Sequence, residues 1–225
     1  MWCEEGGGVR VAIITGVYGA YDPVRSLPDL HGFDDAVCVT DDERLAPDGW
    51  RVVVKRTPMP PRMACKYPKM LPWEFTDCEA AIWLDAAFSV NGSGLSEFVR
   101  PQLERHDFIV FKHPEDRSCL VDEMRLCSQW KKYSAYPMHE QVKFYLKQGM
   151  PTGFGLWAAG MVGWRFTDEA KQFGRAWFGQ NASWSIQDQV SLPYLLWKHE
   201  RVPGEWECHE FDNPFITHHG HLSHH

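Results

Sequence analysis

Five short stretches of the chain are almost continuously apolar, without the polar alternation of a half-exposed strand. They are residues 9–15, 36–40, 50–55, 80–84 and 108–111. Runs of this length and composition are typical of strands that are covered on both faces. The connections between them are long enough for crossover helices. The pattern therefore predicts an α/β fold, a mostly parallel sheet with helices on both faces.

The C-terminal half contains the clearest helical patterns. Thr167 is expected to cap a helix over residues 168–178, because its hydroxyl can accept a backbone N–H of the first turn. A second helix is predicted over residues 186–198, where Pro193 either produces a kink or marks the true start of the helix.

Length and composition favour one packed domain. The chain has 225 residues, of which 44% are hydrophobic and 14% aromatic, and these values exclude global disorder. A chain of this length is expected to form a single domain over residues 1–225. Residues 1–8 and 216–225 are expected to be flexible or tail segments.

Charge and cysteine content limit the expected partners and compartment. The 23 Lys and Arg against 30 Asp and Glu give a net charge of −7, which argues against general binding of duplex DNA but not against a single extruded base. Neither a membrane-spanning run of ~20 apolar residues nor a signal-peptide pattern is found. The seven cysteines form no C-x-x-C pair, which favours reduced thiols and a cytoplasmic protein.

One predicted strand delivers an acid at its carboxyl end, in the sequence Ile82-Trp83-Leu84-Asp85. In open α/β sheets, ligands bind in the crevice beyond the carboxyl ends of the strands. A carboxylate there can hold a divalent cation, which neutralises a diphosphate. The alternative is that Asp85 only turns the chain, since Ala86 and Ala87 follow it in place of a second acid.

The turn after the first predicted strand is a candidate donor-binding loop. It contains Thr15, Gly16 and Tyr18, where the glycine would allow close approach to a nucleotide and the tyrosine could stack on a base. The alternative is an ordinary turn. Because the chain has neither a Walker sequence nor G-x-G-x-x-G, the familiar ATP and NAD sites are disfavoured.

A proline-rich connection contains three cations within eight residues, Arg62, Lys66 and Lys69. In an acidic protein, such a group could face a diphosphate. The alternative is a solvated basic face. The position of this connection, just before the strand that leads into Asp85, favours the functional interpretation.

Further polar residues are candidates for contact with an acceptor. Asp188 could serve as a base, as an anchor for an acceptor hydroxyl or as an electrostatic stabiliser, or it could be an ordinary acid in a first helical turn. Gln189 follows it directly, and His113 and Arg117 follow the fifth predicted strand. The alternative for the last two residues is a surface loop.

The C-terminus is rich in histidine. His219 and His221 are candidate ligands of a divalent ion, because neutral imidazole binds such ions well. The alternative is a tail without a ligand role.

Five segments, read together, resemble the uncharacterised-domain family numbered 616, which is grouped with the GT-A-type glycosyltransferases. They are Lys66-Tyr67-Pro68-Lys69, Ile82-Trp83-Leu84-Asp85, Lys112-His113-Pro114, Gly149-Met150-Pro151 and Asp188-Gln189. They follow in the order of that family and span about residues 10 to 200. The late Asp-Gln pair and a terminal histidine also resemble the glycogenin-like sugar-nucleotide transferases.

This resemblance implies a GT-A-like fold, a nucleotide-sugar donor such as a UDP-sugar, and transfer of the sugar to an acceptor hydroxyl. It also implies a divalent metal, Mn²⁺ or else Mg²⁺. Carried over by position, Asp85 takes the metal–diphosphate role, Lys66 and Lys69 lie near the donor phosphates, and Asp188 lies near the reacting sugar.

The sequence departs from that pattern in two places. The D-x-D motif is reduced to Asp85-Ala86-Ala87, and the tail lacks H-x-x-G-x-K-P-W. These departures allow a metal site completed by a distant histidine, or a metal-independent enzyme in which Arg62, Lys66 and Lys69 neutralise the diphosphate. A metal-dependent hydrolase and a nucleotide-sugar-binding protein without turnover are the alternative functions. The acceptor stays open among glycan, protein, lipid and modified nucleobase.

Overall fold

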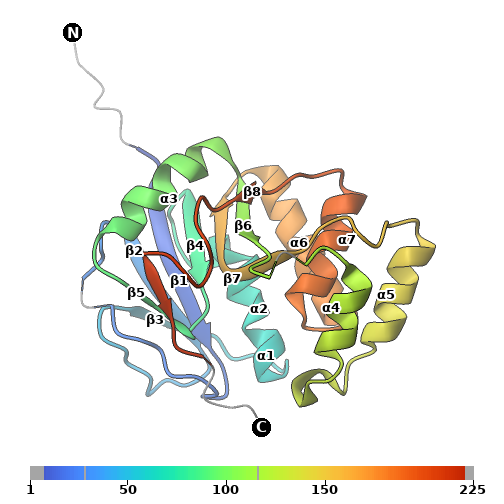
Figure 1. Cartoon of the computed structure of the whole chain (residues 1–225). Coiled ribbons are helices and arrows are strands. Elements are labelled where there is room, and N and C mark those ends of the chain that lie inside the picture. Colours follow the sequence, from blue (N-terminus) through green and yellow to red (C-terminus); the bar gives the residue numbers. More distant parts are fainter. Residues whose placement is uncertain (1–7, 28, 116, 221–225) are drawn as a thin grey trace.

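The computed structural model describes residues 8–27, 29–115 and 117–220, and a central sheet of seven strands dominates it (Figure 1). The strands are β1 Val11–Val17, β2 Asp35–Thr40, β3 Arg51–Val54, β4 Ala80–Leu84, β6 Phe108–Lys112, β7 Trp157–Arg165 and β8 Gly204–Glu205. Their order is β3-β2-β1-β4-β7-β6-β8. All neighbours pair in parallel except β7, which is antiparallel to both β4 and β6.

The five apolar runs correspond to β1, β2, β3, β4 and β6, so the predicted α/β fold with a mostly parallel sheet is confirmed. Every residue of β1 and β4 is buried, as expected for strands covered on both faces. β3 differs, because it lies at the edge of the sheet and all four of its residues are partly or fully exposed. An apolar run alone does not distinguish an edge strand from a central one.

Strand β7 is missing from the prediction, although it is the longest of the seven. Its sequence is rich in alanine and glycine, which have low strand propensity. Two of its glycines are required by packing: a Cβ at Gly160 would lie 2.4 Å from Glu210 Oε1, and one at Gly163 would lie 2.8 Å from the Trp206 ring. The small residues therefore reflect what packs against the strand.

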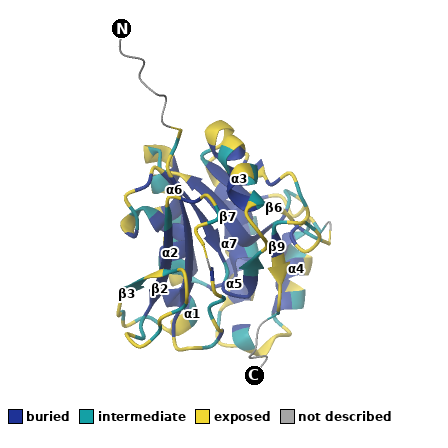
Figure 2. Ribbon diagram, turned by 90° about the vertical axis from the view of Figure 1, so that its left-hand side faces the viewer, coloured by how far each residue is buried: buried dark blue, intermediate teal, exposed yellow. Residues whose placement is uncertain are grey.

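Helices cover both faces of the sheet. They are α1 Pro61–Ala64, α2 Lys66–Met70, α3 Gly94–Arg105, α4 Leu120–Cys127, α5 Met138–Lys147, α6 Asp168–Ser183 and α7 Asp188–Lys198, with short 3₁₀ turns at Pro72–Glu74 and Lys131–Tyr133. The larger of two hydrophobic clusters joins one face to α2 and α4–α7, and the smaller joins the other face to α3. In the side view, α2 and α3 lie on opposite sides of the buried strands (Figure 2).

The two predicted helices are confirmed with altered bounds. Thr167 caps α6, since its hydroxyl accepts the Ala170 N–H at 3.1 Å, and the helix extends five residues further than the expected end. Helix α7 begins at Asp188, and Pro193 lies inside it, so the proline does not mark its start. Within the described residues, none of the helices has the length and apolar character that a membrane crossing needs.

The C-terminal segment forms a strand where a tail was expected. Residues Ile216–His218 form β9, which pairs antiparallel with β5 Phe88–Val90 in a separate two-stranded sheet. The prediction of a flexible tail is therefore wrong for these three residues. Residues 1–7 and 221–225 of the expected tails lie outside the described residues.

Candidate active site

A cavity of about 710 Å³ lies at the carboxyl ends of β1 and β4. The start of β7 also reaches this edge, because β7 runs in the opposite direction. The remaining walls come from α1 and α2, the start of α7, the segment 129–133 and the C-terminal residues Glu210, Phe211 and His218. This is the edge at which open α/β sheets bind their ligands.

Asp85 lies in this cavity, directly after β4. Its backbone N–H donates to Gly160 O at 2.8 Å, which fixes the start of the turn. Its Oδ1 accepts the Trp83 Nε1–H at 2.5 Å and lies 3.3 Å from Lys69 Nζ. The side chain is 33% exposed, so the carboxylate faces the cavity, as its place at the strand end predicts.

Two lysines of α2 are joined by one carboxylate of α7. Lys66 and Lys69 are three residues apart and therefore share one side of the helix. The ammonium groups of both lie 2.7 Å from Asp188 Oδ2, while Oδ1 accepts an N–H from Asn181 at 2.9 Å. The basic segment and the late Asp-Gln pair therefore meet within the cavity.

This pairing sets the charge states of the three groups. Burial alone would raise the pKa of Asp188, but the two ammonium groups outweigh it and lower the pKa to about 2. Burial lowers the pKa of Lys66, whereas for Lys69 the neighbouring Asp188 and Asp85 outweigh burial and raise the pKa. A carboxylate with so low a pKa is a weak base, which favours an anchoring or electrostatic role for Asp188 over proton transfer.

Two further cations stand on aromatic rings at the cavity. The Arg62 guanidinium lies 4.9 Å from the centre of the Tyr21 ring. Lys132 Nζ lies 4.8 Å from the centres of the Trp130 and Tyr133 rings. Such contacts hold a cation in place without neutralising its charge.

The charged residues lining the cavity are five cations and four acids: Arg62, Lys66, Lys69, Lys131 and Lys132, against Asp22, Asp85, Asp188 and Glu210. The cavity thus carries a positive excess within a protein of net charge −7. Such a local excess favours an anionic ligand.

Residues 34–217 match a family model described as TOD1/MUCI70, glycosyltransferase-like domain. The chain belongs to this family. The predicted glycosyltransferase-like resemblance is thereby confirmed, and the match spans from β2 to β9. No curated protein matches the chain.

Two of the expected donor contacts are absent from the cavity of this glycosyltransferase-like domain. Thr15 lies inside β1, and its hydroxyl donates to Leu84 O at 2.8 Å. Tyr18 is 1% exposed and packs in the larger hydrophobic cluster, where burial raises the pKa of its hydroxyl. Both predictions are wrong because β1 runs two residues further than expected. Gly16 does line the cavity, and its missing side chain leaves room for the Trp83 ring.

Two of the expected acceptor contacts do not line the cavity. The Arg117 guanidinium lies 3.0 Å from Glu123 Oε2, and its NH2 lies 3.2 Å from His113 Nε2. Gln187 donates to Glu123 at 3.3 Å and to Gln189 at 2.7 Å. Of the three predicted acceptor residues, Gln189 alone lines the cavity, so direct contact by His113 and Arg117 is wrong.

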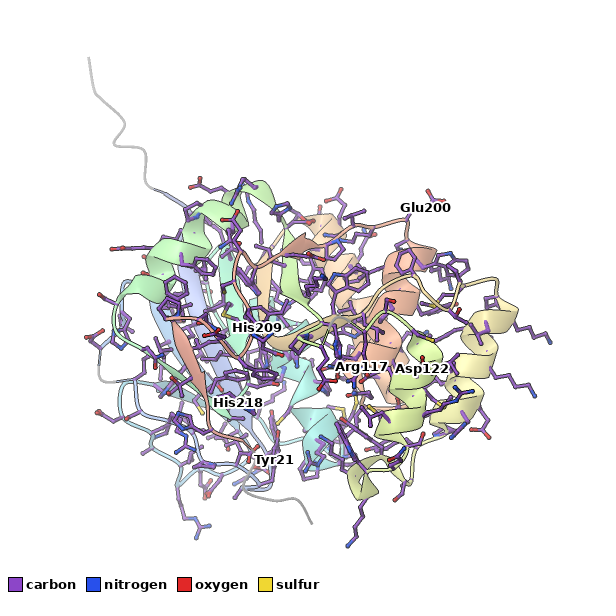
Figure 3. The ribbon with its side chains drawn as sticks, viewed as in Figure 1. Tyr21, Arg117, Asp122, Glu200, His209 and His218 are labelled. Carbon is purple, nitrogen blue, oxygen red and sulfur yellow. The ribbon has the colours of Figure 1, made fainter. Side chains whose placement is uncertain are left out.

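Figure 3 shows this separation. Asp122 lies on α4 and Arg117 just before this helix, apart from Tyr21 and His218. Residues that follow a strand need not face the crevice: here His113 and Arg117 lie close to the buried Glu123 carboxylate instead.

The expected histidine ligands are not assembled with Asp85. His219 is exposed directly after β9, where its Nε2 lies 2.8 Å from Ser89 Oγ, and His221 lies outside the described residues. The neighbouring His218 lines the cavity instead, with its ring 5.0 Å from that of Phe211. Across the residues that the structure describes, no three His, Cys, Asp or Glu side chains are grouped to hold a metal.

One acid of the cavity is missing from the sequence-based prediction. Glu210 is 5% exposed, and its Oε1 accepts the Gly160 N–H at 3.1 Å. Burial and, after it, the nearby Asp85 raise its pKa to about 7. No local pattern marks this residue, because its contacts are to strands far earlier in the chain.

Proposed function

We propose that this glycosyltransferase-like domain transfers a sugar from a nucleotide-sugar donor to an acceptor hydroxyl, and that Arg62, Lys66 and Lys69 bind the donor diphosphate. The observation that carries the proposal is the pair of lysines held by Asp188 in the cavity at the carboxyl edge of the sheet. Family membership supports the transfer chemistry in general terms.

The lysine pair is suited to stabilise a leaving diphosphate. An ammonium group has three N–H donors, of which Lys66 uses one, on Asp188. Negative charge accumulates on the leaving phosphate in the transition state, so cations fixed in advance stabilise that state more than the ground state. Asp188 fixes both ammonium groups and thereby acts as their anchor.

Metal dependence stays a prediction. Asp85 Oδ1 already accepts an indole N–H and contacts an ammonium group, and the described residues offer no three-ligand group. These residues therefore do not fit a divalent ion by themselves, and the roles proposed here use none. The test is donor turnover after treatment with EDTA and after addition of Mn²⁺ or Mg²⁺.

Lys66→Met tests the diphosphate site directly. Asp188 keeps Lys69 as its partner in this variant, so no buried carboxylate is left without a cation. Loss of one charge-assisted hydrogen bond of about 1.5–3 kcal/mol predicts a roughly 10- to 100-fold lower affinity for a nucleoside diphosphate. The exposed Lys143→Met on α5 is the matched control.

The measurements are binding of UDP and GDP by calorimetry and turnover of a panel of UDP- and GDP-sugars. Wild-type affinity and turnover in Lys66→Met would contradict the proposed site. Rapid release of free sugar without any acceptor would instead favour the hydrolase, and donor binding without turnover would favour the binding protein.

A further inference from the structure

We infer that Glu210 is the residue that accepts the proton of the acceptor hydroxyl. This assignment rests on the proposed transfer function and names its base, which no motif of the sequence indicates. Glu210 lies on the C-terminal segment between β8 and β9 and lines the same cavity as the lysine pair.

One glycine fixes Glu210 relative to Asp85. Gly160 of β7 accepts the Asp85 backbone N–H through its carbonyl and donates its own N–H to Glu210 Oε1. A side chain at position 160 would displace the carboxyl, because its Cβ would lie 2.4 Å from Oε1. The absence of a side chain in β7 thus creates the place that Glu210 occupies.

Glu210 is available for proton transfer in a way that two other acids of the cavity are not. Asp188 is bound to two ammonium groups, and Asp85 accepts from an indole and an ammonium group. Within the described part of the chain, the Glu210 carboxyl forms no ion pair with Lys or Arg, and it accepts the Gly160 N–H. Asp22 also lines the cavity and is the rival acid.

The groups that act on the Glu210 carboxyl come from several parts of the chain. Burial and Asp85, after β4, raise its pKa, while the Gly160 N–H of β7, Lys69 of α2 and His209 lower it, with a resulting value of about 7. His218 of β9 lines the same cavity. A base whose pKa lies near the working pH is effective in both accepting and releasing a proton.

The proposed step is a single displacement. The acceptor hydroxyl loses its proton to the Glu210 carboxylate while its oxygen forms a bond to the anomeric carbon of the donor sugar. The bond between that carbon and the phosphate oxygen breaks, and its electron pair leaves with the diphosphate, next to Lys66 and Lys69. Attack from the side opposite to the leaving group predicts inversion at the anomeric carbon.

Glu210→Gln tests the assignment in the full chain. The amide keeps an oxygen that can accept the Gly160 N–H, and it cannot take up a proton at neutral pH. We expect transfer to fall by roughly 100-fold or more. Binding of UDP or GDP should change less than about 2-fold, because the diphosphate site is intact, so the loss appears in kcat. The exposed Glu207→Gln, on the same segment, is the matched control.

The assay uses the UDP- or GDP-sugar with the largest thermal shift, with p-nitrophenyl glycosides and water as acceptors. In the wild type, kcat/KM should fall below about pH 7, because this parameter reports the free enzyme, and this acid limb should be absent from the residual rate of Glu210→Gln. NMR of the first-formed product should show inversion.

Three results would overturn the assignment: wild-type kcat in Glu210→Gln, a retained anomeric configuration, or a loss of transfer in Asp22→Asn that Glu210→Gln does not share. A wild-type protein that neither binds nor consumes any nucleotide sugar would refute the proposed function itself.

Discussion

Asp188 is a buried carboxylate with both oxygens occupied, one by two ammonium groups and the other by an amide. Removing its charge would leave Lys66 and Lys69 facing each other in a buried site. Loss of one partner from a buried ion pair costs far more than loss of an exposed pair, because the remaining charge keeps its desolvation penalty. The residue therefore contributes to stability and to the site at once.

Asp188→Asn should lower the free energy of unfolding at pH 7 by about 3–5 kcal/mol. Because its pKa falls from an ordinary 3.8 to about 2, ionised Asp188 stabilises the fold above about pH 4, and this contribution is lost as the pH falls towards 2. The difference between wild type and variant should shrink accordingly.

Urea unfolding at pH 7 and at pH 3 measures this difference. The control is Asp122→Asn, whose pairing with Arg125 is exposed and should be worth less than about 1 kcal/mol. Equal effects of the two variants at pH 7 would argue against the anchoring role of Asp188.

At the scale of elements, the strand prediction succeeded where a strand is buried on both faces, because such a position requires a continuous apolar sequence. β1 and β4 are buried on both faces, and uninterrupted apolar runs of this kind have few other interpretations. β7 is buried over most of its length but contains glycines whose reason lies in Glu210 and Trp206, which are more than 40 residues away in the sequence. No local rule carries that information.

The same limit applies to the site. The acid at the end of β4 and the cations of α1 and α2 could be predicted, because strand order brings both to one edge. The sequence alone could not exclude Tyr18 as a donor contact, since a shift of two residues in the end of β1 decides whether its side chain lies in the core or in the cavity. Glu210 depends on a C-terminal segment that returns across the sheet to reach Gly160.

Gly160→Ala tests the role of β7 as the element that holds two acids. The new Cβ would lie 2.8 Å from the Phe88 ring in addition to its close approach to Glu210, and overpacking of this kind costs about 1–3 kcal/mol. We expect lower stability in thermal unfolding and a loss of transfer that approaches that of Glu210→Gln.

Gly179→Ala is the control for this substitution. Gly179 is exposed within α6, and an added Cβ would meet no other atom within 4 Å, so alanine should raise stability by about 0.5–1 kcal/mol. A Gly160→Ala protein with unchanged stability and rate would show that β7 tolerates a side chain there.

At the scale of the whole molecule, charge is distributed unevenly. The chain has a net charge of −7, yet cations outnumber acids in the lining of the cavity. The lining of the cavity therefore favours an anionic donor more than the net charge of the chain does. Arg62 is the best residue for testing the effect of these cavity charges on an anionic donor, because it contacts the Tyr21 ring and forms no ion pair among the described residues.

Arg62→Gln should weaken binding of a nucleoside diphosphate at a small cost in stability, about 0.5–1 kcal/mol for the lost contact with the Tyr21 ring, since no acid loses its partner. Loss of a charged hydrogen bond predicts roughly 10- to 100-fold weaker affinity. A ligand that binds the folded state raises the melting temperature, so the shift produced by UDP or GDP should decrease in the variant, while the temperature without ligand should change no more than in the control. Arg175→Gln is the matched control, because Arg175 stands on the Trp73 ring in the same manner but outside the cavity. Equal ligand-induced shifts in the two variants would place the diphosphate elsewhere.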